Sequence, residues 1–154
     1  MINKAIACIL ARPQVFLWLL SYCARVVGVH QIGSLSCWVL FNGRRFSKWL
    51  PTISIQHTLH AERCIHLHSH PYPFHVFMLS GSYREATLDG ENVYRAGDAV
   101  FYPRVGFHRI IDVTPGGFYA LLIMYGGEQP WGYVVGEHYV DHLVYNENRK
   151  EKLL

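Results

Sequence analysis

The stretch His66–Gly81, HLHSHPYPFHVFMLSG, decides both the fold and the site that this sequence predicts. Its first five residues place His66, His68 and His70 at alternate positions, and His75 follows a Pro-Tyr-Pro interruption. Side chains two apart in a β-strand leave the same face, so this spacing predicts that the first three imidazoles project together. Two such imidazoles can share one metal ion if a third ligand arrives from elsewhere in the chain. Surface or hydrogen-bonded histidines are the alternative, and the spacing alone leaves it open.

A second segment, GDAVFYPRVGFH, runs from Gly97 to His108, and the two segments together resemble the cupin family. The first cupin motif, Gly-x5-His-x-His-x(3,4)-Glu-x6-Gly, is matched by His68, His70 and Gly81; the second, Gly-x5-Pro-x-Gly-x2-His-x3-Asn, is matched by Gly97, Pro103 and His108. The span of 15 residues between the two motifs is typical of the family. The resemblance covers about residues 38 to 140. It implies a small β-barrel with His68, His70 and His108 as metal ligands on its inner face.

The main departure from the family pattern is that the glutamate of the first motif is missing. No glutamate stands at the motif position, which falls on Phe74 or His75, and Glu62 occupies the place of the first motif's glycine. Gly106 comes one place late, and Asp112 replaces the motif asparagine. Three histidines, or four if one more turns inward, still suit a divalent transition metal such as iron, zinc or nickel.

His75 is the first candidate for that fourth ligand, and His66 is the second. Ligand imidazoles must be neutral, so the sequence predicts that metal affinity falls below about pH 6.5, where free histidine takes up a proton.

The fold class that the sequence predicts is all-β. Apolar or alternating runs separated by Gly, Pro and Asp-Gly turns recur from Thr52 to Tyr125, and the aromatic content of 14% suits strands. Together with the family resemblance, this rhythm predicts a cupin-type double-stranded β-helix barrel, of the jelly-roll kind, over residues 51–145. We expect residues 1–50 to form a helical or extended segment that packs on the barrel, and residues 146–154 to form a polar tail.

The N-terminal apolar run Val15–Cys23 predicts a helix from about Gln14 to Val27 that packs on the barrel. Arg12-Pro13 and Arg25 bound the run too closely for a membrane span of about 20 residues. The core of a signal peptide is the alternative, although no clean small-x-small cleavage site follows it. We prefer the interpretation that this segment stays attached to the barrel, and we expect no membrane partner.

Composition narrows the classes of function. A chain of 154 residues with 51% hydrophobic and 16% charged residues is long enough for one core and is not disordered. The net charge of +3 permits an anionic ligand. The sequence lacks a dense basic patch interleaved with aromatic residues, so we expect no binding of nucleic acid. The four cysteines form no Cys-x-x-Cys pair, which favours buried thiols in a reducing cytoplasm. Cupin-like barrels commonly pair through sheet edges, so we expect a homodimer.

Three hypotheses of function follow. The first is a mononuclear, dioxygenase-like metalloenzyme acting on a small molecule, because three histidines leave coordination positions open for substrate and dioxygen. Tyr83, Glu85, Tyr102 and Arg104 flank the motif strands and are its candidates for positioning or proton transfer. The second is a non-catalytic cupin module that binds a small molecule. The third is a structural protein whose histidines only pack and form hydrogen bonds.

Overall fold

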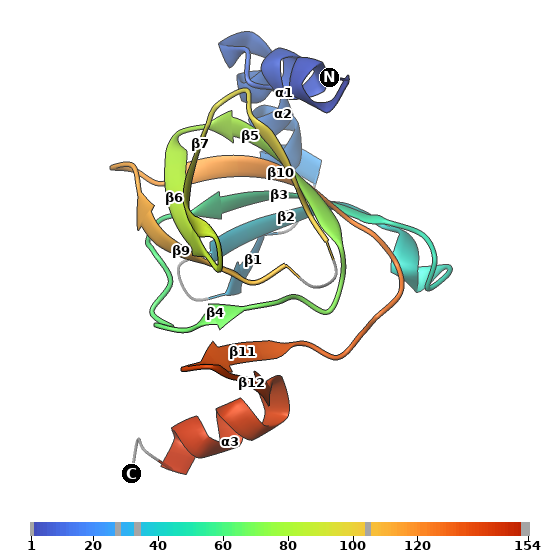
Figure 1. Ribbon diagram of the computed structural model, residues 1–154. Coiled ribbons are helices and arrows are strands. Elements are labelled where there is room, and N and C mark those ends of the chain that lie inside the picture. Colours follow the sequence, from blue (N-terminus) through green and yellow to red (C-terminus); the bar gives the residue numbers. More distant parts are fainter. Residues whose placement is uncertain (1, 27–28, 33–34, 104–105, 152–154) are drawn as a thin grey trace.

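Two six-stranded antiparallel sheets face each other, with helices at both ends of the chain (Figure 1). The computed structural model describes residues 2–26, 29–32, 35–103 and 106–151. The first sheet has the order β1 (Val29–Ile32), β2 (Leu35–Asn42), β3 (Thr52–Thr58), β10 (Phe118–Met124), β5 (Phe74–Ser80) and β8 (Ala99–Tyr102). The second has the order β12 (His138–Asp141), β11 (Gly132–Val135), β4 (Leu67–His68), β9 (His108–Val113), β6 (Ser82–Thr87) and β7 (Gly90–Arg95). The helices are α1 (Ile2–Leu10), α2 (Pro13–Val26), the short 3₁₀ turn η1 (Gly43–Arg45) and α3 (His142–Glu151).

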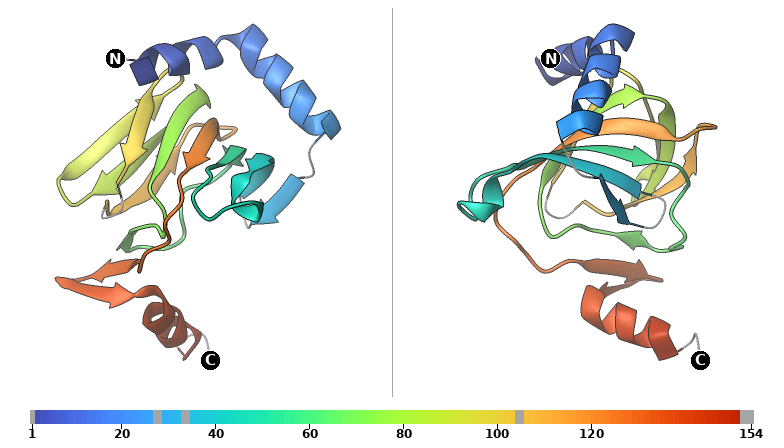
Figure 2. Two further views of the ribbon diagram at one scale, coloured as in Figure 1. Left: turned by 90° about the vertical axis from the view of Figure 1, so that its right-hand side faces the viewer. Right: turned by 180° about the vertical axis from the view of Figure 1, so that it is seen from behind.

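From β3 to β11 the chain passes from one sheet to the other at almost every connection; only the hairpin of β6 and β7 stays within one sheet. This winding is that of a double-stranded β-helix, so the all-β, jelly-roll prediction is confirmed. Figure 2 shows the same two sheets from the side and from behind.

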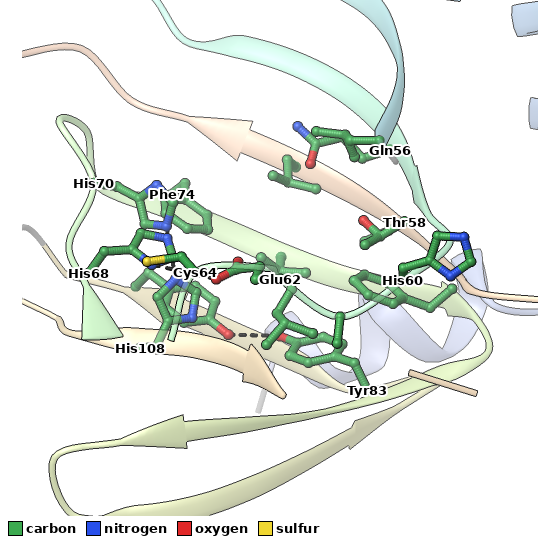
Figure 3. Close-up of a pocket in the computed structure, with 18 of the residues that line it drawn as sticks. Gln56, Thr58, His60, Glu62, Cys64, His68, His70, Phe74, Tyr83 and His108 are labelled. Atoms are coloured by element: carbon green, nitrogen blue, oxygen red, sulfur yellow. Dashed lines mark hydrogen bonds and ion pairs between the residues drawn. The ribbon is translucent and has the colours of Figure 1, made fainter. Parts of the chain in front are cut away.

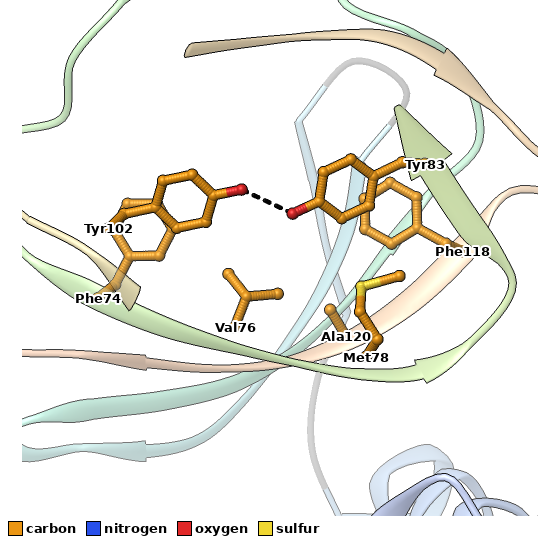
Figure 4. Close-up of a cluster of buried hydrophobic side chains, with 7 residues drawn as sticks. All are labelled: Phe74, Val76, Met78, Tyr83, Tyr102, Phe118 and Ala120. Carbon is orange, nitrogen blue, oxygen red and sulfur yellow. Dashed lines mark hydrogen bonds between the residues drawn. The ribbon is translucent and has the colours of Figure 1, made fainter. Parts of the chain in front are cut away.

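The core between the sheets comes from alternate residues of β5 and its neighbours (Figure 4). It consists of Phe74, Val76, Met78, Tyr83, Tyr102, Phe118 and Ala120. Because side chains alternate along a strand, the three β5 residues of this set share its inner face. Burying one large apolar side chain of this kind contributes about 1.5–3 kcal/mol relative to exposing it.

The outer face of the first sheet is also covered, by the N-terminal helices. Leu79 of β5 and Ile55 of β3 form a second buried cluster with Cys23 of α2, and Phe16 and Leu19 of the same helix pack against it. Strand β5 is therefore buried on both faces, which explains why its sequence, FHVFMLS, is apolar almost throughout.

The barrel begins earlier in the chain than the sequence analysis placed it. Strand β2 pairs with β3 from Leu35, opposite Thr58, to Asn42, opposite Thr52, so it belongs to the first sheet. The expected helix over residues 14–27 is present as α2, but α1 was not predicted, because the Arg12-Pro13 break leaves only a short apolar run before it. At the other end, α3 starts at His142, inside the range predicted for the barrel.

Two finer expectations also need correction. The segment from His66 to His70 is not one strand, since only Leu67 and His68 pair in β4. All four cysteines are free thiols, but Cys8 is exposed and Cys64 is half-buried.

Within the described residues, no single helix is long and apolar enough to cross a membrane. The helical stretches Asn3–Leu10 and Pro13–Cys23 meet that test only as a pair, by length and composition, and they are bent by 75°.

The turn before β10 offers a test of the packing between strands. Gly116 and Gly117 both have positive φ, at 86° and 80°, so an alanine costs about 1–2 kcal/mol at either. A Cβ on Gly117 would lie 2.3 Å from the carbonyl oxygen of Thr58, whereas one on Gly116 would meet nothing within 4 Å. We expect Gly117→Ala to lower the free energy of unfolding in urea by at least about 1 kcal/mol more than Gly116→Ala. Equal losses would contradict this close approach of the turn to β3.

Candidate metal centre

Three histidines from two motifs meet at one end of the barrel (Figure 3). His68 of β4 and His108 of β9 are direct partners in the antiparallel register, so their side chains leave the same face of the second sheet. His70 follows β4 and turns its ring towards them, with ring centroids 4.9 Å from His68 and 5.0 Å from His108. One nitrogen from each ring lies within 4.8 Å of the other two. The structure therefore brings together the three histidines that the sequence analysis expected to meet.

The donor set fits a first-row divalent metal. Imidazole nitrogens bind zinc at about 2.0–2.1 Å, which places two of them roughly 3–3.5 Å apart. The Nε2 atoms of His70 and His108 lie 2.8 Å apart, and a nitrogen of His68 lies within 4.8 Å of the ligand atoms of both. Three neutral nitrogen donors suit zinc, iron or nickel better than magnesium or calcium.

A buried carboxylate holds His108 in the orientation that a metal ligand needs. Oε2 of Glu85 lies 2.8 Å from Nδ1 of His108, and both side chains are almost fully buried. A carboxylate has no proton to give, so Nδ1–H of His108 donates the hydrogen bond. In the neutral ring, Nε2 then carries the free lone pair that points towards His70.

The same carboxylate is held by two further groups. The Tyr102 hydroxyl donates to Oε2 of Glu85 at 2.6 Å, and Nδ2 of Asn92 lies 3.4 Å from Oε1. Tyr83 completes the chain, with its hydroxyl 2.7 Å from that of Tyr102. Burial alone would raise the pKa of Glu85, but the hydrogen bonds from His108 and Tyr102 outweigh it and lower that pKa. Glu85 is therefore a carboxylate that positions His108, with the two tyrosines behind it.

The structure joins three of the four predicted catalytic candidates, Tyr83, Glu85 and Tyr102, through consecutive hydrogen bonds. Tyr83 and Tyr102 line the cavity, and burial raises the pKa of both phenols, so they stay protonated and can donate. Arg104 lies outside the described residues.

Burial also keeps the other two candidate ligands neutral. It lowers the pKa of His68 to about 4, with a further contribution from the neighbouring His108. It lowers the pKa of His70 well below the ordinary value, again with help from the adjacent histidines. The rings of His68 and His70 are therefore neutral near pH 7, as metal binding requires.

Sequence reasoning missed Glu62, which brings a carboxyl group into the cavity. Its Oε2 lies 3.5 Å from Nδ1 of His68, and within the described part of the chain neither atom has a hydrogen-bond partner. Burial raises the pKa of Glu62 to about 7. The backbone N–H of Glu62 donates to the carbonyl of Ile110 at 3.0 Å, which ties this segment to β9. No motif marks Glu62, because it reaches the site from an irregular segment ahead of β4.

The histidine cluster opens into a cavity of about 660 Å³ between the sheets (Figure 3). Its walls are largely apolar and include Phe74, Val76, Ile110, Phe118, Ala120 and Leu122. Polar residues also line it, and Gln56, Thr58 and His60 lie on the side away from the cluster.

The structure does not bring the two candidate fourth ligands to the cluster. His75 is on the opposite face of β5 from Phe74 and Val76, where its Nδ1 lies 2.8 Å from the Tyr125 hydroxyl. His75 follows the proline interruption and so belongs to β5, not to the strand that carries His68. In β5 it alternates with the inward-facing Phe74 and Val76 and therefore faces outward. His66 turns away as well and packs edge-on against Tyr145 of α3.

Solved structures share this architecture. The polyketide cyclase RemF from Streptomyces resistomycificus matches with a TM-score of 0.59 and 16% identity, over 80% of this chain and 89% of that one. An RmlC-like cupin from Shewanella frigidimarina matches with a TM-score of 0.52 and 18% identity, over 67% and 86% of the two chains. The chain has the cupin fold. Oxalate decarboxylase from Bacillus subtilis matches with a TM-score of 0.52 and 18% identity over 67% of this chain, which spans only 28% of that enzyme.

No protein-family model matches the chain, and no curated protein matches its sequence. The similarity to solved structures nevertheless confirms, at the level of the fold, the cupin resemblance drawn from the two motifs.

Removing one ligand tests the metal centre. We expect His108→Ala to abolish stoichiometric metal while the barrel stays folded, because the apolar strands supply the core. Metal analysis of untagged protein, with far-UV circular dichroism, measures both. His57→Ala is the matched control: this histidine of β3 stacks on Tyr119 and contacts the carbonyl of Gly116, away from the cavity. Equal metal content in His108→Ala and the parent protein would place the metal elsewhere.

The pH at which metal is lost is expected to lie lower than the sequence alone predicted. Because folding lowers the pKa of His68 to about 4 and that of His70 in the same direction, both rings stay neutral well below pH 6.5. We expect metal content after dialysis to be the same at pH 7 and pH 6 and to fall only below about pH 5. Half-loss near pH 6.5 would show that the cluster is open to water.

Proposed function

We propose that this protein is a mononuclear metalloenzyme that acts on a small, largely apolar molecule. One observation carries the proposal: His68, His70 and His108 converge at one end of a 660 Å³ apolar cavity, with His108 held by Glu85. A purely structural role would not require three imidazoles to face one point inside a space that a ligand can fill.

The cavity walls indicate the kind of substrate. A volume of about 660 Å³ suits a molecule of drug-like size, and most of the lining is apolar. Arg63 is the only lysine or arginine among the lining residues that the structure describes, and it is exposed. A strongly anionic substrate would lack a buried cationic partner there. We therefore infer an apolar or aromatic body with an oxygen atom directed at the histidines.

Oxygen-dependent oxidation is the reaction that we place first. A divalent iron held by three histidines supplies open positions where substrate and dioxygen can react. The chain's own part is to orient the imidazoles through Glu85, to exclude water with the apolar walls, and to take up a substrate proton at Glu62. With a pKa of about 7, Glu62 is suited to accept and return a proton near neutral pH.

The position of Glu62 favours a second candidate, a redox-neutral proton transfer such as enolisation or cyclisation. A divalent ion held by the three histidines would supply a Lewis acid for a carbonyl oxygen of the substrate, and Glu62 would take the proton from the neighbouring carbon. A non-catalytic module that binds a small molecule is the remaining alternative. It shares the cavity but predicts no turnover.

Turnover with two metals separates the candidates. Protein loaded with iron(II) should consume oxygen with catechols, thiols or 1,3-diketones, and His108→Ala should not. If zinc-loaded protein instead exchanges the α-protons of a 1,3-diketone for deuterium, the redox-neutral reaction is favoured. Glu62→Gln should then slow the exchange by about 10²–10⁴-fold, while Glu91→Gln, an exposed glutamate paired with Arg84, should not. Binding of these compounds without oxygen uptake or exchange would favour the binding module.

The homodimer and the cytoplasmic location remain predictions from the sequence.

A further inference from the structure

The charges of this chain are divided unevenly between its two parts. Residues 1–61 carry six lysines and arginines and no aspartate or glutamate, since Glu62 is the first acidic residue. The remaining residues carry eight basic and eleven acidic side chains. An asymmetry of this kind points to an anionic partner for the basic part. The basic part contains both N-terminal helices.

Helix α2 has two apolar faces, and the protein covers only one of them. Phe16, Leu19 and Cys23 pack on the first sheet. On the other side, Leu17 is 61% exposed and Trp18 is 64% exposed. Tyr22, one turn further on, is also exposed and stacks on Trp18, with ring centroids 5.9 Å apart.

Helix α1 repeats this arrangement. Ala7 is fully buried against the barrel, whereas Ile6 and Ile9 are exposed. Lys4, on the side of α1 nearer the buried Ala7, keeps most of its side chain in solvent and lies 3.9 Å from Asp98. Arg12, also exposed, stands at the break between the helices. Figure 2 shows both helices on the outside of the first sheet, at the opposite end of the molecule from α3.

We propose that the outward face of α1 and α2 binds the surface of an anionic lipid bilayer. Leucine, isoleucine and tryptophan would enter the boundary between headgroups and acyl chains, and the basic residues would contact the headgroups. Two helices joined by a short break can both lie in one plane, so the 75° bend does not prevent this. The helices lie on the membrane in this arrangement and do not cross it. The proposal departs from the sequence expectation of no membrane partner and is independent of the metal site.

Charge decides between this partner and a second copy of the chain. Pairing two copies through this face would bring together the helices of both, which carry basic residues and no aspartate or glutamate. An anionic bilayer instead attracts each basic residue near its surface and accepts the exposed aromatic rings.

The test is co-sedimentation of the full-length protein with vesicles. We expect binding to vesicles containing phosphatidylglycerol to be roughly tenfold or more stronger than binding to pure phosphatidylcholine, and to weaken at high salt. Leu17→Ser combined with Trp18→Ser should reduce the binding at least about tenfold. The matched control is Ile65→Ser combined with Leu88→Ser, which removes two residues that are 74% and 63% exposed outside the helices.

Three results would overturn the proposal. The first is equal binding to both kinds of vesicle, and the second is equal loss in the two double variants. The third is a dimer, seen by analytical ultracentrifugation, that Leu17→Ser with Trp18→Ser dissociates, because a second copy would then cover this face. Circular dichroism of each variant checks that the fold is intact, so that loss of binding is not loss of structure.

Discussion

The hydrogen bond between the buried carboxylate of Glu85 and Nδ1 of His108 is the interaction on which the site depends. A buried carboxylate is costly unless donors surround it, and here His108, Tyr102 and Asn92 surround Glu85. These donors come from β7, β8 and β9 around a carboxylate on β6, so satisfying one charge ties four strands of both sheets together. The same bond sets the tautomer of His108 and leaves its Nε2 facing the cavity.

The motifs predicted the fold because they combine a strand period with fixed turns. The apolar run of β5, the hairpin turn at Gly90 and the turn at Gly117 all fall where alternation and glycine placed them. Strand β2 was left in the segment outside the barrel because its sequence suggests an entry hairpin or loop, and only its pairing with β3 shows that it belongs to the first sheet. Helix α1 was missed for a similar reason, since its packing on the barrel and not its own length stabilises it.

The sequence predicted the site residues that strand pairing positions, but it did not predict Glu62, which lies in an irregular segment. His68 and His108 face each other because β4 and β9 pair there, and the family spacing carries that information. Glu62 lies in no regular element, and the sequence placed it only as a substitute for a glycine. His75 was offered as a ligand on proximity in sequence, but the alternation of β5 sends it to the outer face. Glu85 was selected as a catalytic candidate, and the structure gives it a positioning role behind His108.

The absence of the motif glutamate has a consequence for chemistry. The cluster offers three imidazole nitrogens, and the carboxyl group of Glu62 stands beside it instead of within it. A donor set of three imidazoles would leave more positive charge on a bound ion than a set that includes a carboxylate, and so would strengthen its pull on a substrate oxygen in the proposed reaction. In the proposed reaction the carboxyl group of Glu62, whose pKa burial raises, would stand beside the ion for proton transfer.

A crystal structure of metal-loaded protein, with anomalous data collected at the metal edge, tests the central claim most directly. The account predicts one anomalous peak, about 2.0–2.1 Å from a ring nitrogen of each of His68, His70 and His108, with Glu85 still bonded to Nδ1 of His108. A peak at any other set of residues, or none after loading with iron or zinc, would contradict it.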